Sequence, residues 1–217
     1  MEKIIENSKR YIIKKFPEVM IIDTAHEIIF EGRFIFEARQ GIHEIHVAPL
    51  LKIIMSKQYP DILPVCYDID KKIQYDHIFS DSSLCVSTTL DLGIGLKNSQ
   101  SIQDFIEKFV IPFFLSYKYW QQTGIDLNGD RSHGSKGVFE SLYEYLFPCD
   151  LTENEMRYLL CWASKTKKFK KCIPMHLQKE FLHRNIRYVE KLRNVGISIL
   201  RQQYKVLIQT RPLKNRL

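Results

Sequence analysis

YDHIFSDSSLCVSTTLDL, residues 75–92, combines a histidine, a polar turn and a single cysteine within eighteen positions. His77 opens the stretch, residues 80–83 form the turn, and Cys85 follows between two apolar neighbours. This pattern predicts a short extended segment whose backbone holds the thiol, with small hydroxyl residues after it that leave room for a large partner. Cys85 is therefore a candidate nucleophile. The alternative is a buried structural cysteine, because free cysteine is among the most buried residue types.

Upstream of this stretch, the chain predicts one helix and then a series of strands. Residues 2–16 place apolar side chains at helical spacing, and Pro17 ends that helix. Residues 26–57 are rich in β-branched and aromatic side chains, which predicts an antiparallel meander with breaks at Gly32 and Pro49.

A stiff crossing and an aromatic helix complete this pattern. Tyr59, Pro60 and Pro64 lie in the crossing, where each proline fixes φ and removes a hydrogen-bond donor. Residues 101–120 predict an apolar helix that packs into the core and that Pro112 kinks or divides. The sequence therefore predicts an α+β protein.

Charge is distributed unevenly along the chain. Of its 32 basic and 25 acidic residues, 16 and 4 fall in residues 152–217, which leaves 16 and 21 in residues 1–151. Such a basic region binds nucleic acid, an acidic protein, or no partner at all. The absence of an aromatic stacking pattern beside the basic residues in the sequence argues against nucleic acid.

Composition also limits the cellular setting. No apolar run approaches the ~20 residues of a membrane span, and the N-terminus lacks the apolar centre of a signal peptide. The five cysteines are irregularly spaced, unlike a disulfide framework. We therefore expect a cytoplasmic protein with reduced thiols and no membrane association.

The order of predicted elements, with the crossing and the cysteine stretch, resembles the ubiquitin-conjugating enzymes. In that family the crossing reads Y-P-x-x-P-P, which Tyr59, Pro60 and Pro64 match, while Leu63 replaces one proline. The resemblance implies an N-terminal helix, an antiparallel meander and C-terminal helices over residues 1–148.

Near the cysteine, the chain departs from the common family pattern. Of the family's His-Pro-Asn triplet only His77 is matched, eight positions before Cys85, and the asparagine that stabilises the oxyanion has no counterpart. These departures, and the loop of residues 131–134, resemble divergent bacterial members encoded in antiphage defence operons.

The resemblance implies an acyltransferase. Cys85 would accept a ubiquitin-like protein as a thioester from an activating enzyme and transfer it to an amine on a target protein, such as a nucleotidyltransferase. His77 is the first candidate for assisting the transfer and His133 the second. For His77, a role in bracing the loop through backbone hydrogen bonds is the alternative.

A second resemblance concerns CWASKTKKFKKC, residues 161–172, which is similar to the SEC-C zinc motif. Cys161 and Cys172 occupy two of its four ligand positions, and the other two positions hold non-ligating residues. Because structural zinc takes four ligands, we expect a metal-free remnant and no cofactor. The alternative is a zinc site on Cys161, Cys172 and a recruited His176 or Cys149.

These patterns predict a catalytic domain over residues 1–148 and a small, basic, mostly helical module over residues 149–217. Three other functions stay open on the sequence. They are an inactive ubiquitin-conjugating-like scaffold, a basic nucleic-acid-binding protein, and a cysteine protease, for which no Cys–His pairing motif is visible beyond His77 and His133.

Overall fold

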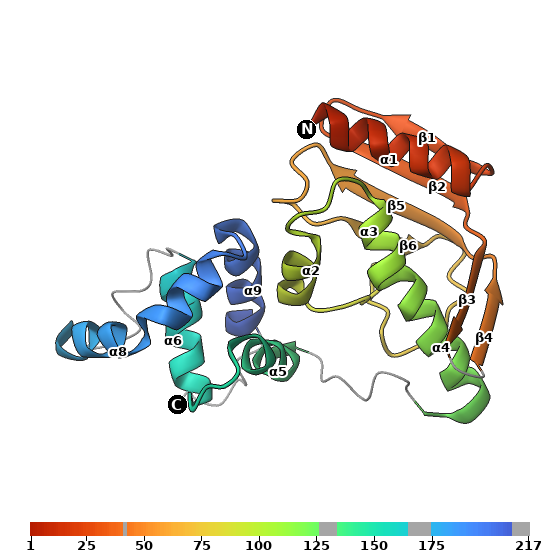
Figure 1. Cartoon of the computed structure of the whole chain (residues 1–217). Coiled ribbons are helices and arrows are strands. Elements are labelled where there is room, and N and C mark those ends of the chain that lie inside the picture. Colours follow the sequence, from red (N-terminus) through yellow and green to blue (C-terminus); the bar gives the residue numbers. More distant parts are fainter. Residues whose placement is uncertain (41–42, 126–133, 165–174, 210–217) are drawn as a thin grey trace. The chain divides into compact units, whose positions relative to one another are not determined.

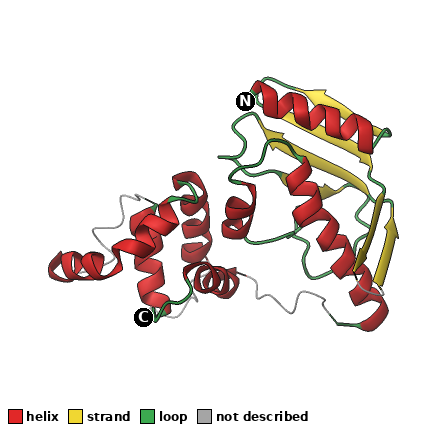
Figure 2. Cartoon of the chain, viewed as in Figure 1, coloured by secondary structure: helices red, strands yellow, loops and turns green. Residues whose placement is uncertain are grey.

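The computed structural model describes residues 1–40, 43–125, 134–164 and 175–209 (Figure 1). Its helices and strands make a mixed α+β fold, which confirms the predicted class (Figure 2). Contacts divide the chain into two units. The αβ unit comprises Met1–Ser87 and Gly95–Asp130, and the helical unit comprises Thr88–Ile94 and Arg131–Leu217.

An antiparallel four-stranded sheet forms the centre of the αβ unit, with strand order β1-β2-β5-β6. Its strands are β1 (Val19–Asp23), β2 (Glu27–Arg33), β5 (Leu50–Ser56) and β6 (Val65–Asp68). Along β5, buried Leu51, Ile53 and Met55 alternate with half-buried residues, so one face of the sheet is core. The other face carries a row of β-branched residues, one from each strand: Ile22, Ile29, Ile54 and Val65.

A separate hairpin interrupts the meander between β2 and β5. It consists of β3 (Phe36–Gln40) and β4 (His43–Val47), paired from Phe36 opposite Val47 to Gln40 opposite His43. Pro49 lies between β4 and β5, because a proline cannot donate to the ladder. Gly32 in β2 has φ +153°, and a Cβ there would meet the carbonyl oxygen of Glu18 at 2.6 Å.

Helix α1 (Glu2–Lys15) packs against the sheet through its buried residues Ser8 and Ile12. The Ser8 hydroxyl donates to the Ile4 carbonyl at 2.7 Å and accepts the backbone N–H of Ile102 at 2.9 Å. Phe16 ends the helix. Its ring is part of a buried aromatic cluster in the core, whose members are Phe16, Phe34, Phe36 and Phe114.

The predicted aromatic helix is divided, and the division lies at Pro112. A short α3 (Gln103–Phe105) passes into a π-helical turn (Ile106–Val110) and then into α4 (Ile111–Thr123), where Pro112 is in the first turn. A proline has no N–H for the preceding turn and its ring crowds the carbonyl four residues back. The wider π turn relieves that crowding without ending the helical course.

The helical unit contains α5 (Gly134–Leu146), α6 (Glu153–Ala163), α8 (Met175–Arg193) and α9 (Ile197–Gln209). A capping box starts α6, where Thr152 and Glu155 each accept the other's backbone N–H. The helical unit also contains residues 88–94, most of which belong to helix α2 (Thr89–Leu96).

Two contacts explain why residues 88–94 belong to the helical unit. Gly93 lies so close to α9 that a Cβ would meet Ile199 Cγ2 at 2.5 Å. The buried Ser141 Oγ of α5 lies 2.9 Å from Thr88 Oγ1 and 3.2 Å from Asp91 Oδ2. The observed units thus differ from the predicted boundary after residue 148. Helix α5 and residues 88–94 both cluster with the C-terminal helices, because their small and apolar residues pack there.

Candidate active site around Cys85

Cys85 lies in a narrow two-stranded flap. Ile78 and Leu84 form an antiparallel bridge, and the Cys85 backbone N–H donates to the His77 carbonyl at 2.8 Å. The Phe79 N–H donates to the Ser83 carbonyl at 2.9 Å on the other side of this bridge. In this register Cys85 is directly opposite His77. Directly opposite residues of an antiparallel pair share a face, with their Cβ atoms about 5 Å apart.

The flap extends the sheet at the free edge of β6. The Leu84 N–H donates to the Cys66 carbonyl at 2.8 Å, and the Asp68 N–H donates to the Ser82 carbonyl at 2.9 Å. These bonds hold the strand that ends at Cys85 through its backbone, as the apolar neighbours of the cysteine predicted.

A tight turn closes the flap around Asp81. Its carboxylate accepts the Ser83 hydroxyl at 2.6 Å and the Ser83 N–H at 3.0 Å, and both bonds lower the pKa of Asp81. Ser82 takes a left-handed conformation with φ +67°. The polar turn predicted at residues 80–83 is therefore held by its own side chains.

An aromatic cluster supports the segment that carries His77. The Tyr75 ring lies 4.9 Å from the His77 ring, measured between centroids, and 5.4–5.6 Å from Phe113, Tyr117 and Trp120. The last three rings project from α4. The aromatic side chains of this helix therefore pack against the flap strand as well as in the core.

The thiol of Cys85 differs from the other described thiols in its exposure. Cys66, Cys149 and Cys161 are buried, whereas Cys85 is only half-buried. Partial burial still raises the pKa of the Cys85 thiol, and complete burial raises that of Cys66 further. At neutral pH Cys85 is therefore mostly protonated, and the reactive thiolate is a minor form.

Two neighbouring carboxylic acids, Asp68 and Asp70, lie in the loop before the flap. Asp68 is 3% exposed, and burial raises its pKa. Its Oδ2 accepts the Ile73 N–H at 2.9 Å. The neighbouring Asp70 forms an ion pair with Lys72 at 2.7 Å, which lowers the pKa of Asp70. One acid of the pair therefore keeps its proton to higher pH, while the other ionises readily.

The remaining predicted site residues are only partly described. His133 and Cys172 lie outside the described residues. Cys161 is buried in α6, and His176 lies in α8, where its side chain is not described. Within the part of the chain that the structure describes, no group of three or more His, Cys, Asp or Glu side chains is placed to hold a metal ion. The metal-free remnant thus stays a prediction, and a zinc site on Cys161, Cys172 and His176 stays its alternative.

Tyr75 is the site residue that sequence reasoning missed. It lies just before the turn at Asp76 and His77. No local pattern marked it, because its ring partners on α4 lie about forty positions further along the chain.

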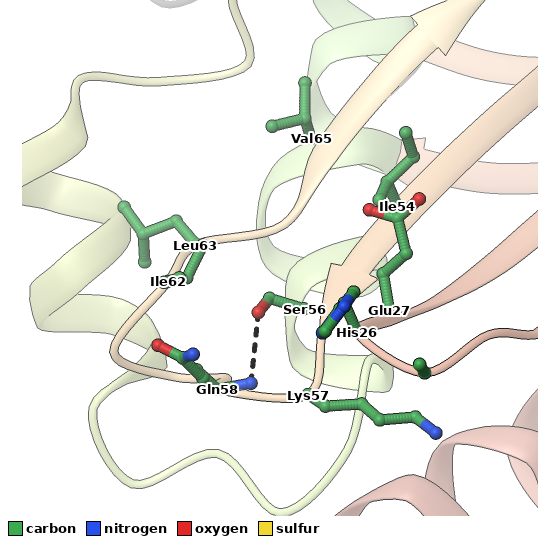
Figure 3. A pocket seen from close by; sticks show the side chains of 10 residues that line it. His26, Glu27, Ile54, Ser56, Lys57, Gln58, Ile62, Leu63 and Val65 are labelled. Atoms are coloured by element: carbon green, nitrogen blue, oxygen red, sulfur yellow. Dashed lines mark hydrogen bonds between the residues drawn. The ribbon is translucent and has the colours of Figure 1, made fainter.

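A hollow of about 480 Å³ lies at one end of the sheet, where β2 begins and β5 ends (Figure 3). Ile54, Ile62 and Val65 contribute apolar side chains to it, and His26 and Lys57 contribute polar ones. The Gln58 N–H donates to Ser56 Oγ at 3.0 Å and shapes its rim. Neither Cys85 nor His77 lines this hollow.

Comparisons with protein-family models, with curated proteins and with solved structures found no match for the chain. Among the described residues, no helix has the length and apolar character that crossing a membrane requires.

Proposed function

We propose that this chain is an acyltransferase of the ubiquitin-conjugating type, with Cys85 as the residue that carries the acyl group. The observation that carries this proposal is the thiol of Cys85, which is half-buried where the other described thiols are fully buried, and which is held directly opposite His77 in a flap at the sheet edge. Such a thiol is accessible in part, while its backbone is fixed.

The finer fold assignment belongs to the same proposal. Helix α1, four antiparallel strands, a crossing with Tyr59 fully buried, the flap and then α2 to α4 are similar in order to the ubiquitin-conjugating fold. The β3–β4 hairpin is an addition to that order. The missing oxyanion asparagine and the added hairpin support a divergent member, of the kind found in bacterial antiphage defence.

In the first step, the Cys85 thiolate attacks the carbonyl carbon of a ubiquitin-like protein's C-terminal glycyl thioester on an activating enzyme. The new C–S bond forms as the bond to the activating enzyme's sulfur breaks, and that sulfur leaves as a thiolate. The proton lost from Cys85 can pass to the departing thiolate. A thioester has a good leaving group, so this exchange requires little from the protein beyond access and position.

In the second step, an amine of a target protein attacks the thioester carbon on Cys85. An amide bond forms, the Cys85 thiolate leaves, and the proton of the amine passes to a base. His77 is the described side chain placed for this step, since it shares a face of the flap with Cys85. The ring of Tyr75 beside it restricts where the His77 ring can lie.

The decisive test uses an activating enzyme and a ubiquitin-like protein encoded beside this chain, with products separated on a non-reducing gel. We expect an adduct that thiol reductants remove. Cys85→Ala should abolish it, and Cys85→Ser should give an ester that resists reductant. Matched controls are Cys66→Ala and Cys149→Ala, which remove buried thiols and should retain the adduct.

The pH dependence of loading provides a second readout. Because burial raises the pKa of the Cys85 thiol, the loading rate should keep rising as pH passes the ordinary thiol pKa of about 8.5. An adduct that persists in Cys85→Ala would exclude the proposed role of this thiol. A complete lack of adduct with the neighbouring partners would instead favour an inactive scaffold.

A further inference from the structure

Phe79 is an exposed aromatic residue in the flap that carries Cys85. Its side chain is 54% exposed, whereas most of the phenylalanines that the structure describes are buried. Its backbone is nonetheless fixed, because the Phe79 N–H donates to the Ser83 carbonyl and the Phe79 carbonyl accepts the Ser82 N–H, both at 2.9 Å. About half of the apolar area of this ring therefore contributes nothing to folding and is available to a partner.

The register of the flap places Phe79 on the face that carries the Cys85 thiol. Ile78 and Leu84 form the bridge between the two arms, and Leu84 is buried at 5% exposure. Side chains alternate along an extended segment, so the residues that flank the bridge, namely His77, Phe79 and Cys85, point to the opposite face. Phe79 is the diagonal neighbour of Cys85, and such residues lie about 7–8 Å apart, a distance that an aromatic side chain spans.

The turn that follows Phe79 fixes the flap at this point. Ser83 lies directly opposite Phe79 and is a small residue, whose hydroxyl donates to the Asp81 carboxylate at 2.6 Å. The side chain opposite the ring is thus bonded to the turn. A phenylalanine side chain has only two torsions, so little conformational entropy is lost when a partner covers its ring. A fixed backbone and a stiff side chain together make Phe79 a suitable anchor for an apolar group.

We propose that Phe79 determines the specificity of the acyl transfer by binding an apolar side chain near the C-terminus of the acyl donor. This inference rests on the proposed function of Cys85. The donor is the expected occupant because its terminal glycine is bonded to the Cys85 sulfur in every loaded molecule, which holds the preceding residues beside the flap. An acceptor amine is present only in the second step.

The spacing of Phe79 and Cys85 limits which donor residue makes this contact. At about 3.3 Å per extended residue, a separation of about 7–8 Å corresponds to two or three residues of the donor. The side chain in contact should therefore belong to the second or third residue before the terminal glycine. An apolar side chain is expected there, because the exposed area of the ring gains free energy only when it is buried.

The test measures loading of the full chain from short synthetic peptide thioesters, with the adduct on Cys85 quantified by mass spectrometry. Each peptide ends in a glycine joined to a small thiol, which leaves with the Cys85 proton as the new C–S bond forms. The other positions are Ser, except for one Leu placed one to four residues before the glycine. At limiting peptide concentration, Leu at the second or third position should raise the loading rate about five- to ten-fold over the all-Ser peptide, since part of that side chain is buried against the ring.

Variants show whether this preference depends on the ring. Phe79→Ala should remove the advantage of Leu over Ser, and Phe79→Leu should retain most of it. The matched control is Met20→Ala, which removes an exposed apolar side chain of β1 and should keep the full preference. A ratio of two peptides measured on one protein does not respond to a general loss of thiol reactivity, so it separates a contact with the donor from a structural role of Phe79. Circular dichroism establishes that each variant is folded.

Three results would overturn the inference. Equal preference for Leu in Phe79→Ala and in the parent, or no advantage of Leu at any position, would exclude the contact while Cys85 still loads, which leaves the proposed function intact. A Phe79-dependent preference for apolar residues around the amine of an acceptor peptide, without one in the donor, would assign the ring to the acceptor. A lack of any adduct on Cys85 would overturn the proposed function, and this inference with it.

Discussion

Removal of the Tyr75 ring should both destabilise the αβ unit and slow loading of Cys85. The ring contacts four others at centroid distances of 4.9–5.6 Å, and each aromatic pair contributes about 0.5–1.5 kcal/mol beyond its buried area. A fully buried aromatic residue replaced by Ala loses about 3–5 kcal/mol. Because Tyr75 is only half-buried, we expect Tyr75→Ala to lower the free energy of unfolding by about 2–3 kcal/mol. Tyr75→Phe keeps the ring and should lose less than about 1 kcal/mol.

Urea unfolding of this unit can be followed by the fluorescence of Trp120, one of the rings against Tyr75. The chain's other tryptophan, Trp162, lies in the helical unit, so all variants should carry Trp162→Phe. Separate signals are needed because two units do not unfold as a single two-state system.

Loading of Cys85 in Tyr75→Ala should slow by about 10- to 100-fold, since small displacements of a reacting group have effects of this size. Tyr75→Phe should load at nearly the normal rate. The reasoning would be refuted if Tyr75→Ala were destabilised but loaded normally, because the aromatic cluster would then stabilise the fold without positioning His77 and Cys85. It would also be refuted if the stability of Tyr75→Ala were unchanged.

Two further predictions concern packing and pH. Gly93→Ala should gain about 1 kcal/mol in helix propensity but lose about 1–3 kcal/mol to the 2.5 Å contact with Ile199 Cγ2, so the helical unit should melt at lower temperature. Ile199→Ala is itself destabilising because Ile199 is buried, but in that background Gly93→Ala should no longer destabilise. A Gly93→Ala protein more stable than the parent would contradict the contact. Burial raises the pKa of Asp68, so its stabilising contribution is complete below its unfolded pKa of about 3.9 and is lost as pH rises through the folded value. The asparagine side chain in Asp68→Asn does not ionise. The free energy of unfolding of this variant, measured in urea, should therefore rise relative to that of the parent from about pH 4 upward. A difference between the two proteins that does not change with pH would exclude ionisation of Asp68 as the cause.

Local patterns in the sequence predicted most of the αβ unit, because its elements follow one another along the chain. The β-branched run from residue 26 contains β2 to β5, and the break at Pro49 falls where a ladder donor is missing. The separate β3–β4 hairpin was not predicted, since nothing local distinguishes a strand that joins the main sheet from one that pairs only with its neighbour. Pro112 predicted a division of the helix, but its π-helical form depends on packing on both sides.

Contacts between distant segments account for what the sequence left out. Residues 88–94 follow the cysteine stretch directly, yet Gly93 and Asp91 pack against α9 and α5, about 105 and 50 positions further along. No local pattern distinguishes Tyr75 from the chain's other aromatic residues, and only the rings of α4 that surround it identify its place at the site. The pairing of His77 with Cys85 was expected only from a family resemblance, and the register of the flap provides an independent physical basis for it.

The two steps of the proposed reaction require different things from the flap. In thioester exchange the attacking and leaving atoms are both sulfur, so a half-buried Cys85 with a minor thiolate fraction is sufficient. In amine transfer the oxyanion needs hydrogen-bond donors, and the Cys85 N–H already donates to the His77 carbonyl at 2.8 Å. With that N–H committed and the family's asparagine missing, stabilisation of the oxyanion falls to the His77 side chain, to backbone N–H groups after Cys85, or to the acceptor protein. Loading without efficient transfer to free amines is the behaviour expected if the acceptor supplies that donor.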